Sequence, residues 1–380
     1  MDPGTYHPVD RYRNFTSSWK QLVYGGYFYM DVKELLKQAV LEGASDIFIV
    51  SGLPVSYRLE GVITKKSNEK LMPSETAEYL RQIYELSNDA DFDKLLQKGD
   101  DDFSFAIPGF SRFRVNAYKQ RGTLSAVIRV ITFELPSPKE LGIPESVINT
   151  GNLSKGLVLV TGPAGTGKST TLACIIDYIN NHHQKHIITL EDPLEFLHRH
   201  SQGIVSQREI NIDTESYLTA LRASLRQSPD VILLGEMRDY ETIGVAMTAA
   251  ETGHLIFSTL HTLGAANTID RIIDAFPAAE QKQIAMQLSM VLQCVISMQL
   301  VPGIHGQQIA AFEIMKVTPA IRNMIRENKI PQIEGSLYAS NKEDMISMDN
   351  SLLNLYKAGR ITKDTALEYS TNPEMLNKKL

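Results

Sequence analysis

The chain has 380 residues, of which 43% are hydrophobic and 22% are charged, and its formal net charge is −6. This composition is typical of a globular protein that is long enough for two domains. The acidic balance argues against a nucleic-acid partner, because non-specific nucleic-acid binding depends on basic surface. No apolar run in the sequence approaches the roughly 18 residues of a membrane span, so we expect a cytoplasmic protein.

Residues 1–29 form an N-terminal extension that lacks the basic start and apolar core of a signal peptide. Its end, "YGGYFYM", is aromatic and rich in glycine. We predict either a disordered tail or an upstream addition with Met30 as an alternative start, and we assign the segment no function.

Residues 30–134 combine amphipathic helices with alternating strands. The stretches "MDVKELLKQAVLEGA" and "PSETAEYLRQIYEL" have helical patterns, and "DDFSFAI", "SRFRVNAYKQ" and "LSAVIRVIT" have strand patterns. This order predicts a small α+β domain in which helices pack on an antiparallel sheet. A cluster of prolines and a glycine then predicts a linker over residues 135–150.

Residues 151–380 alternate between strand and helix patterns. We expect strands at 157–161, 186–191, 231–235 and 254–260, and helices at 169–181, 215–227, 240–252, 265–275 and 278–298. This alternation predicts an α/β domain with a parallel sheet, followed by a helical tail from about Pro319. Cys174 and Cys294 each lie in an apolar pattern, so we expect buried thiols rather than a disulfide framework or a zinc site.

The stretch "GLVLVTGPAGTGKSTTL" matches the spacing G-x-x-x-x-G-K-[ST] between an apolar strand and a helix. In such a loop, glycines let backbone N–H groups turn toward a phosphate, and the helix N-terminus adds a partial positive charge. The predicted nucleotide-binding residues are Gly162, Pro163, Ala164, Gly165, Thr166, Gly167, Lys168, Ser169 and Thr170. Lys168 would reach the β- and γ-phosphates of ATP, and Ser169 would bind Mg²⁺.

Acidic residues follow two of the predicted strands. Glu191 ends the strand at 186–191, with Asp192 and Glu195 after it, and Glu236 follows the strand at 231–235. Ligands bind at the carboxyl ends of strands in open α/β sheets, where an acid can orient water or hold the hydration shell of a metal. Because Gly235 stands where an Asp usually follows the apolar run, we assign the acid role to Glu236, with Mg²⁺ held through water, and leave open whether Glu191 is the principal base.

Two histidines and two arginines are further candidates. His254 and His261 bracket the strand at 254–260 and either couple the phosphate state to neighbouring segments or are structural. Arg114 and Arg129 lie in strand patterns of the first domain. They are either solvated strand residues or arginines that stabilise charge at the γ-phosphate from another domain.

Together these motifs resemble the secretion-superfamily ATPases, and most closely the type IV pilus retraction ATPases, the PilT family. The likeness runs from about Met30 to Leu380. The Walker A motif matches Gly162–Ser169, the Asp box Thr189–Phe196, the Walker B motif Val231–Asp239 and the His box Thr252–Thr262. The stretches "SRFRVNAY" and "VIRVI" resemble the arginine-bearing strands of the family, which implies that Arg114 and Arg129 lie near the nucleotide.

The resemblance implies a homohexameric ATPase with a PAS-like first domain and a RecA-like second domain. It further implies ATP and Mg²⁺ as cofactors, a role in pilus retraction and twitching motility, and peripheral docking to a platform protein at the inner face of the cell membrane. The alternative within the superfamily is a pilus-assembly or type II or IV secretion ATPase. From other classes, a RecA-like DNA motor and a non-hydrolysing nucleotide sensor remain open.

The segment "PAIRNMIRENKIPQ", Pro319 to Gln332, predicts a helix with an apolar stripe at Ile321, Met324 and Ile325. Arg322 and Arg326 fall on what we expect to be a more exposed side. The segment is similar to a C-terminal segment of retraction motors, which implies contact with the pilus machinery. Without that resemblance, it reads as an ordinary surface helix.

Overall fold

The computed structural model describes residues 21–24, 27–59, 61–87, 90–108, 110–131, 133, 135–340 and 344–380. The chain divides into two compact units between Thr132 and Phe133. Within the predicted N-terminal extension, β1 (Gln21–Tyr24) pairs antiparallel with β2 (Tyr27–Met30). The prediction of a disordered tail otherwise falls on residues 1–20 and 25–26, which lie outside the described residues.

The smaller unit contains a six-stranded antiparallel sheet with the order β5-β4-β3-β8-β7-β6. The strands are β3 (Asp46–Ile49), β4 (Ser56–Leu59), β5 (Val62–Lys65), β6 (Asp100–Ile107), β7 (Ser111–Gln120) and β8 (Thr123–Ile131). The helices are α1 (Val32–Leu41), α2 (Pro73–Leu86) and α3 (Phe92–Lys98). Buried side chains from strands and helices form one apolar core, so the unit has the predicted α+β arrangement.

The strands of this unit alternate between core and outer face, as the two-residue period of a strand requires. On β7, Phe113 and Val115 are completely buried, whereas Arg112 and Arg114 lie on the opposite face. The apolar face packs on the helices, and the polar face carries the arginines that the sequence singled out.

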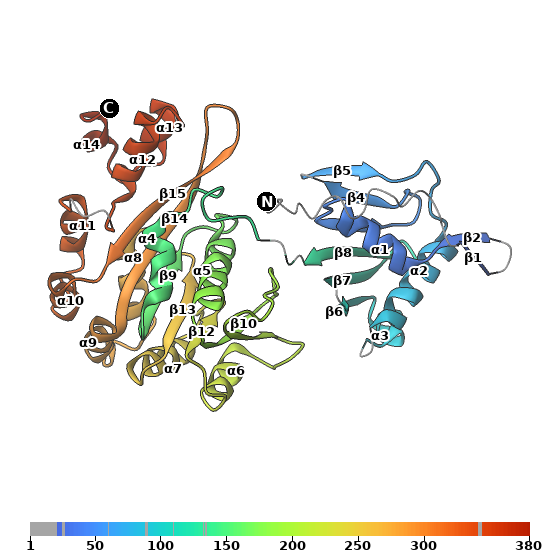
Figure 1. Cartoon of the computed structure of the whole chain (residues 1–380), viewed down its shortest axis with the longest axis horizontal. Helices are drawn as coiled ribbons and strands as arrows, with labels where there is room; N and C mark the ends of the chain where they lie inside the picture. The colour runs from blue at the N-terminus through green and yellow to red at the C-terminus, as the bar shows by residue number, and fades with distance from the viewer. Residues whose placement is uncertain are drawn as a thin grey trace, which may run out of the picture. The chain divides into compact units, whose positions relative to one another are not determined.

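The larger unit contains a seven-stranded sheet with the order β11-β10-β12-β13-β9-β14-β15 (Figure 1). The strands are β9 (Gly156–Thr161), β10 (His186–Glu191), β11 (Ile204–Glu209), β12 (Val231–Leu234), β13 (Leu255–Leu260), β14 (Leu292–Pro302) and β15 (Gln308–Lys316). All neighbours pair parallel except β14 and β15. The predicted parallel sheet is therefore confirmed.

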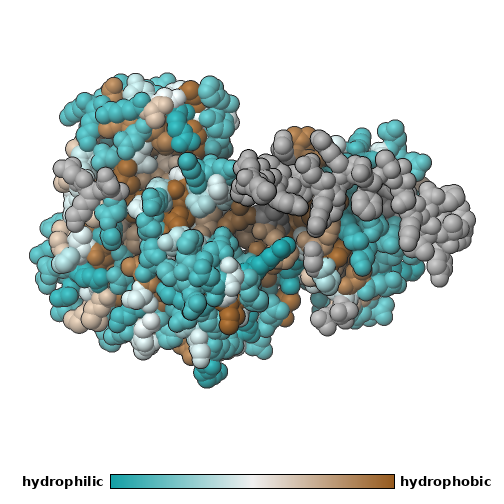
Figure 2. Space-filling model, viewed as in Figure 1, coloured by the Kyte–Doolittle hydropathy of each residue, from teal (hydrophilic) through white to brown (hydrophobic). Residues whose placement is uncertain are grey.

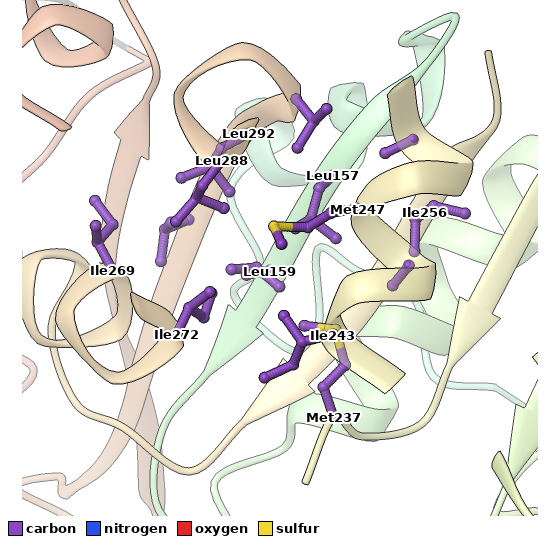
Figure 3. Packing of buried hydrophobic residues seen from close by; sticks show 14 of the residues in the cluster. Leu157, Leu159, Met237, Ile243, Met247, Ile256, Ile269, Ile272, Leu288 and Leu292 are labelled. Atoms are coloured by element: carbon purple, nitrogen blue, oxygen red, sulfur yellow. The ribbon is translucent and has the colours of Figure 1, made fainter. Parts of the chain in front are cut away.

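Helices cover both faces of this sheet. They are α4 (Glu145–Ile148), α5 (Lys168–His182), α6 (Tyr217–Ser224), α7 (Tyr240–Glu251), α8 (Ala265–Asp274) and α9 (Gln281–Val291), with a 3-10 turn at Asn149–Asn152. Leu157 and Leu159 of β9 face Ile243 and Met247 of α7, whereas Val158 and Val160 pack on the α5 side (Figure 3). This alternation buries every residue of β9.

The predicted helix at 278–298 is wrong in its second half. Helix α9 ends at Val291, and the chain continues as β14, which pairs with β9 on one side and β15 on the other. Residues 292–301 are mostly buried in the sheet. A continuous apolar run is compatible with either a buried strand or a buried helix, so periodicity alone could not separate them.

The tail is helical, as predicted: α10 (Pro319–Arg326), α11 (Pro331–Tyr338), α12 (Met348–Lys357), α13 (Lys363–Glu368) and α14 (Pro373–Asn377). Helix α10 buries Ile321 and Ile325. Arg322 lies on a more exposed side than these residues, as expected, but it is half-buried, and its guanidinium donates to the carbonyl oxygens of Ser289 (2.7 Å) and Met290 (2.8 Å) at the end of α9. Arg326 is exposed.

The surface seen in Figure 2 is mostly hydrophilic over the larger unit. Cys174 and Cys294 are free and buried, as expected, and burial raises the pKa of each thiol to about 12. Within the described residues, every helix is too short or too polar to cross a membrane. The segment expected as a linker contributes Ile143, Val147 and Ile148 to the core of the larger unit.

Candidate nucleotide-binding site

The glycine-rich loop joins the carboxyl end of β9 to the amino end of α5. Gly162, Gly165 and Gly167 have φ angles of 141°, 77° and 90°, which residues with a Cβ rarely adopt. A Cβ on Gly162 would lie 2.1 Å from the carbonyl oxygen of Met298 on β14. The loop therefore needs glycine at 162 both for its conformation and for its close contact with the neighbouring strand.

Lys168 lies at the first position of α5 and is 8% exposed. Its Nζ donates to the carbonyl oxygens of Gly162 and Pro163, each at 2.8 Å. Burial lowers the pKa of Lys168, and the carboxylates of Glu195 and Glu236 partly oppose this shift. The ammonium group is thus held beneath the loop, near two carboxylates.

The residues fit a bound phosphate and a hard cation. The N-cap of α5 is Gly167, no side chain among the described residues caps this helix, and its first turn contains no acid. Its first N–H groups are therefore available to phosphate oxygens. Ser169 Oγ donates to Glu195 Oε1 at 2.8 Å, which places hydroxyl and carboxylate oxygens together, and Mg²⁺ prefers such oxygen ligands.

Glu191 ends β10 beside this loop. It lines a small cavity of about 30 Å³ together with Ser169, Phe196, His198 and Thr259 among others. Burial raises the pKa of Glu191 to about 7, although hydrogen bonds from Thr189 and Gln207 lower it in part. Thr189 Oγ1 donates to Glu191 Oε1 at 2.6 Å. A carboxylate with this pKa can exchange protons near neutral pH, as a general base must.

Glu236 follows β12, and its side chain is 13% exposed. Its Oε1 lies 2.6 Å from Arg238 Nη2, and its Oε2 lies 3.7 Å from His261 Nε2. The preceding residue, Gly235, is held by its own N–H, which donates to Leu190 O, and by its carbonyl, which accepts from Thr259 Oγ1. The acid at this strand end is therefore fixed on both sides.

Packing explains why glycine occupies position 235. A Cβ there would lie 2.8 Å from the hydroxyl oxygen of Tyr217 and 3.1 Å from Leu190 O. Tyr217, on α6, thus fills the space that an aspartate side chain would need. This packing explains why the usual aspartate is absent from the end of β12.

The two histidines lie at opposite ends of β13. His261 follows the strand and faces Glu236, with 61% of its side chain exposed. His254 precedes the strand, and its Nδ1 lies 3.0 Å from Ala249 O. In the parallel register between β13 and β9, Leu260 lies opposite Thr161, and Leu255 lies opposite Gly156. The carboxyl end of β13, where His261 follows, therefore lies beside the start of the phosphate loop, whereas His254 lies at the other end of the strand.

Arg114 and Arg129 lie opposite each other on β7 and β8. Arg114 makes a bidentate ion pair with Asp102, with N–O distances of 3.0 and 2.7 Å. Arg129 Nε lies 3.2 Å from Asp46 Oδ1. Both arginines belong to the smaller unit, on the face away from its core.

Sequence reasoning missed three contributors to the site. Met298 of β14 forms the wall of the phosphate loop, Thr259 hydrogen-bonds the carbonyl of Gly235, and Tyr217 packs against the same glycine. Met298 was assigned to a helix, which hid its position. Thr259 lies within a strand of the predicted sheet, so the parallel register could have placed it near the site.

The sequence of this chain is similar to those of known proteins. A family model described as Type II/IV secretion system protein matches residues 26–339. The chain is 45% identical over 348 residues to the type IV pilus retraction ATPase PilT of Pseudomonas aeruginosa, covering 91% of this chain and 99% of that one. It is 47% identical over 277 residues to a twitching motility protein of Neisseria gonorrhoeae, covering 73% of this chain and 74% of that one.

The fold agrees with these similarities. A crystal structure of the pilus retraction motor PilT with bound ADP matches with a TM-score of 0.83 and 44% identity, covering 92% of this chain and 100% of that one. The predicted fold class, a RecA-like P-loop domain preceded by a smaller PAS-like α+β domain, is confirmed, as is the resemblance to the type IV pilus retraction ATPases.

Proposed function

The chain belongs to the Type II/IV secretion system protein family, and on that premise we propose that it is an ATPase motor that drives type IV pilus retraction. The observation that carries this proposal is the phosphate loop: glycines with positive φ, a buried lysine and an uncapped helix N-terminus in one turn of chain. The chain is 45% identical to a retraction ATPase over nearly the whole length of both proteins, and this similarity favours retraction over pilus assembly or secretion.

The residues divide the chemistry among themselves. Lys168 and the loop amides would hold the phosphates of ATP, which needs a positive charge and donors fixed in advance. Glu236 would polarise the attacking water, and its contacts with Arg238 and His261 would set its orientation. Glu191, with a pKa of about 7, is the second candidate for this base.

A magnesium ion is part of the proposal. Ser169 would bind it directly and Glu236 through water, because both oxygens lie at the carboxyl edge of the sheet. When bound, Mg²⁺ supplies positive charge that stabilises the transferred phosphoryl group. Glu195, which accepts from Ser169, would orient that hydroxyl.

Several partners are also proposed. A homohexamer would let Arg114 and Arg129 approach a nucleotide from a separate domain, and their position on the outer face of the small sheet supports this role. The ring would dock on an inner-membrane platform protein of the pilus machinery, which implies peripheral association with the inner face of the cell membrane.

Arg114→Ala and Arg129→Ala should each lower ATP turnover more than ATP affinity. Unchanged turnover in both variants would mean that the two arginines are only solvated strand residues.

The function is tested by measuring ATP hydrolysis by the purified chain and pilus retraction in cells. We expect Mg²⁺-dependent turnover, and Lys168→Ala should reduce it by at least about tenfold, or about 1.4 kcal/mol of barrier, because no backbone amide replaces the charge of the lysine. Retraction should fail in the same variant. Turnover that persists in Lys168→Ala, or retraction that proceeds normally without the chain, would contradict the proposal.

A further inference from the structure

Glu313 is a half-buried carboxylate on β15 that does not belong to the phosphate site. Its Oε1 accepts a hydrogen bond from the N–H of Ala265 at 2.7 Å, and its Oε2 accepts from the N–H of Met348 at 3.2 Å. Ala265 is the first residue of α8, and Met348 is the first residue of α12. One carboxylate therefore joins the N-termini of two helices, each of which carries a partial positive charge.

The surroundings of Glu313 affect its protonation. Desolvation raises the pKa of Glu313, and the hydrogen bonds from the two helix N-termini lower it in part. A carboxylate withdrawn from water needs hydrogen-bond partners, and the two N–H groups supply them. Loss of either N–H contact would leave the carboxylate less well satisfied.

Helix α8 starts immediately after the loop at 261–264, which contains His261. This loop, here called the His261 loop, connects the carboxyl end of β13 to Ala265. Three side chains hold it: Ser297 Oγ accepts from Gly264 N at 2.8 Å, Thr268 Oγ1 donates to Gly264 O at 2.8 Å, and Glu313 accepts from Ala265 N. The position of His261 against Glu236 thus depends on contacts behind the loop.

The same contacts reach the phosphate loop. Thr268 Oγ1 lies 2.8 Å from Thr262 Oγ1 and 3.5 Å from Thr161 Oγ1. Thr161 is the last residue of β9, directly before Gly162. Thr161 and Thr268 are completely buried. The first turns of α8 therefore pack against the residue that precedes the phosphate loop, and Glu313 joins the start of α8 to α12.

We propose that Glu313 is a positioning residue for ATP hydrolysis: by holding the first N–H of α8, it fixes the His261 loop against Glu236 and joins that edge of the sheet to α12. This inference rests on the proposed ATPase function. Glu313 touches no reacting atom, and it acts through the loop. A shift of the His261 loop during turnover would have to move α12 or break one of the two hydrogen bonds.

Glu313→Gln tests the proposal in the full chain. The amide keeps the size of the side chain, but its NH2 group cannot accept from an N–H, so one helix N-terminus loses its partner. We expect kcat for ATP to fall about tenfold while the dissociation constant of ADP changes by less than about twofold, because the interaction positions the reacting groups and leaves the phosphate cradle intact. Hydrogen exchange at residues 262–266 should become faster.

Asp349→Asn is the matched control. Asp349, the second residue of α12, is a buried carboxylate that likewise accepts from two backbone N–H groups, but these belong to Thr371 (2.6 Å) and Asn372 (3.1 Å) between α13 and α14. We expect this variant to lower the melting temperature and leave kcat within about twofold of the wild type. An equal loss of kcat in both variants would overturn the proposal, since any lost carboxylate would then suffice.

Ser297→Ala is the second variant, and it keeps the proposal testable if Glu313→Gln does not fold. It removes the acceptor of Gly264 N and leaves Glu313 in place, and we expect a smaller loss of kcat with the same faster exchange at 262–266. Wild-type kcat and wild-type exchange in whichever of the two variants folds would refute positioning. A wild-type chain that binds ADP but shows no turnover would instead refute the proposed function, while the exchange measurement would still report on Glu313.

Discussion

The two edges of the seven-stranded sheet use similar residues for different purposes. At the amino edge, His254 contacts Ala249 O, and His186 contacts Gln227 O (3.0 Å) and Ser206 Oγ (3.0 Å). At the carboxyl edge, His261 is 61% exposed and faces a carboxylate. Six residues of β13, at about 3.3 Å per residue, separate the two edges by roughly 20 Å.

The difference lies in how polar groups are satisfied. Ring nitrogens at the amino edge bond mainly to backbone carbonyls within the same unit, so those histidines stabilise loops. The carboxyl edge gathers Lys168, Glu191 and Glu236, and the pKa values of Lys168 and Glu191 are shifted by burial. Shifted pKa values that coincide with a glycine loop are typical of a functional site. Position along a strand, rather than residue type, separates the two kinds of histidine.

The largest effect within this comparison should come from the carboxylates. We expect Glu236→Gln to retain nucleotide binding and to slow hydrolysis at least about a hundredfold, as for the loss of a preorganised catalytic group. Glu191→Gln should cause a smaller loss. Steady-state ATP hydrolysis and ADP binding measure both variants. If Glu191→Gln is the slower of the two, the base is Glu191 and the assignment is reversed.

A second prediction concerns the pH dependence of stability at the same edge. Because the pKa of Glu191 is raised from 4.5 to about 7, the folded chain keeps a proton between these values that the unfolded chain has released. Glu191 therefore lowers stability progressively as the pH rises through this window. Glu191→Gln removes this dependence.

The matching measurement is thermal unfolding of both proteins at about pH 5 and about pH 8. We expect the melting temperature of Glu191→Gln, relative to the wild type, to be higher at the alkaline pH. Asp192→Asn is the control, since Asp192 is the next residue in the chain and its side chain is exposed. An equal difference in melting temperature at both pH values would mean that ionisation of Glu191 does not destabilise the folded chain.

The third prediction compares the two histidines directly. His261 Nε2 lies 3.7 Å from Glu236 Oε2, which is too long for a direct hydrogen bond, and an exposed polar contact of this kind contributes up to about 1 kcal/mol, so His261→Ala should slow hydrolysis by no more than about fivefold. His254→Ala should lower the melting temperature and leave turnover within about twofold, because its ring bonds only near its own turn in the described structure. Equal turnover losses would remove the distinction between the edges.

Sequence patterns predicted β9, β10, β12 and β13 because their residues are buried on both faces and form continuous apolar runs, whereas they missed the edge strand β11, which is only partly buried. The strand predicted at 186–191 coincides with β10, and that at 157–161 differs from β9 by one residue. The phosphate loop was recognisable because its spacing is demanding. The same logic failed at β14, whose apolar run continues directly from α9 without a turn signal.

The failure at β14 mattered for the site. Met298, assigned to a helix, lies beside Gly162 and limits the loop to glycine. Likewise, Arg322 looked solvent-facing from helical spacing alone, but the end of α9 lies within its reach. Contacts between segments far apart in the chain decide both cases, and local periodicity contains no information about them.

The smallest effect on turnover is expected at α10, which contains none of the residues discussed at the two edges of the sheet. Arg322 is bonded to three acceptors on α9 and the following residues, so Arg322→Ala should lower the melting temperature. Arg326, one turn further on, is exposed and makes no such contact in the described structure. We expect Arg326→Ala to retain wild-type stability and ATP hydrolysis but to weaken pilus retraction in cells, because an exposed cation is available to a partner. Retraction rates at equal expression measure this, with Lys329→Ala, another exposed cation just beyond α10, as the control. Normal retraction by Arg326→Ala would leave α10 as a packing helix whose arginines serve the fold alone.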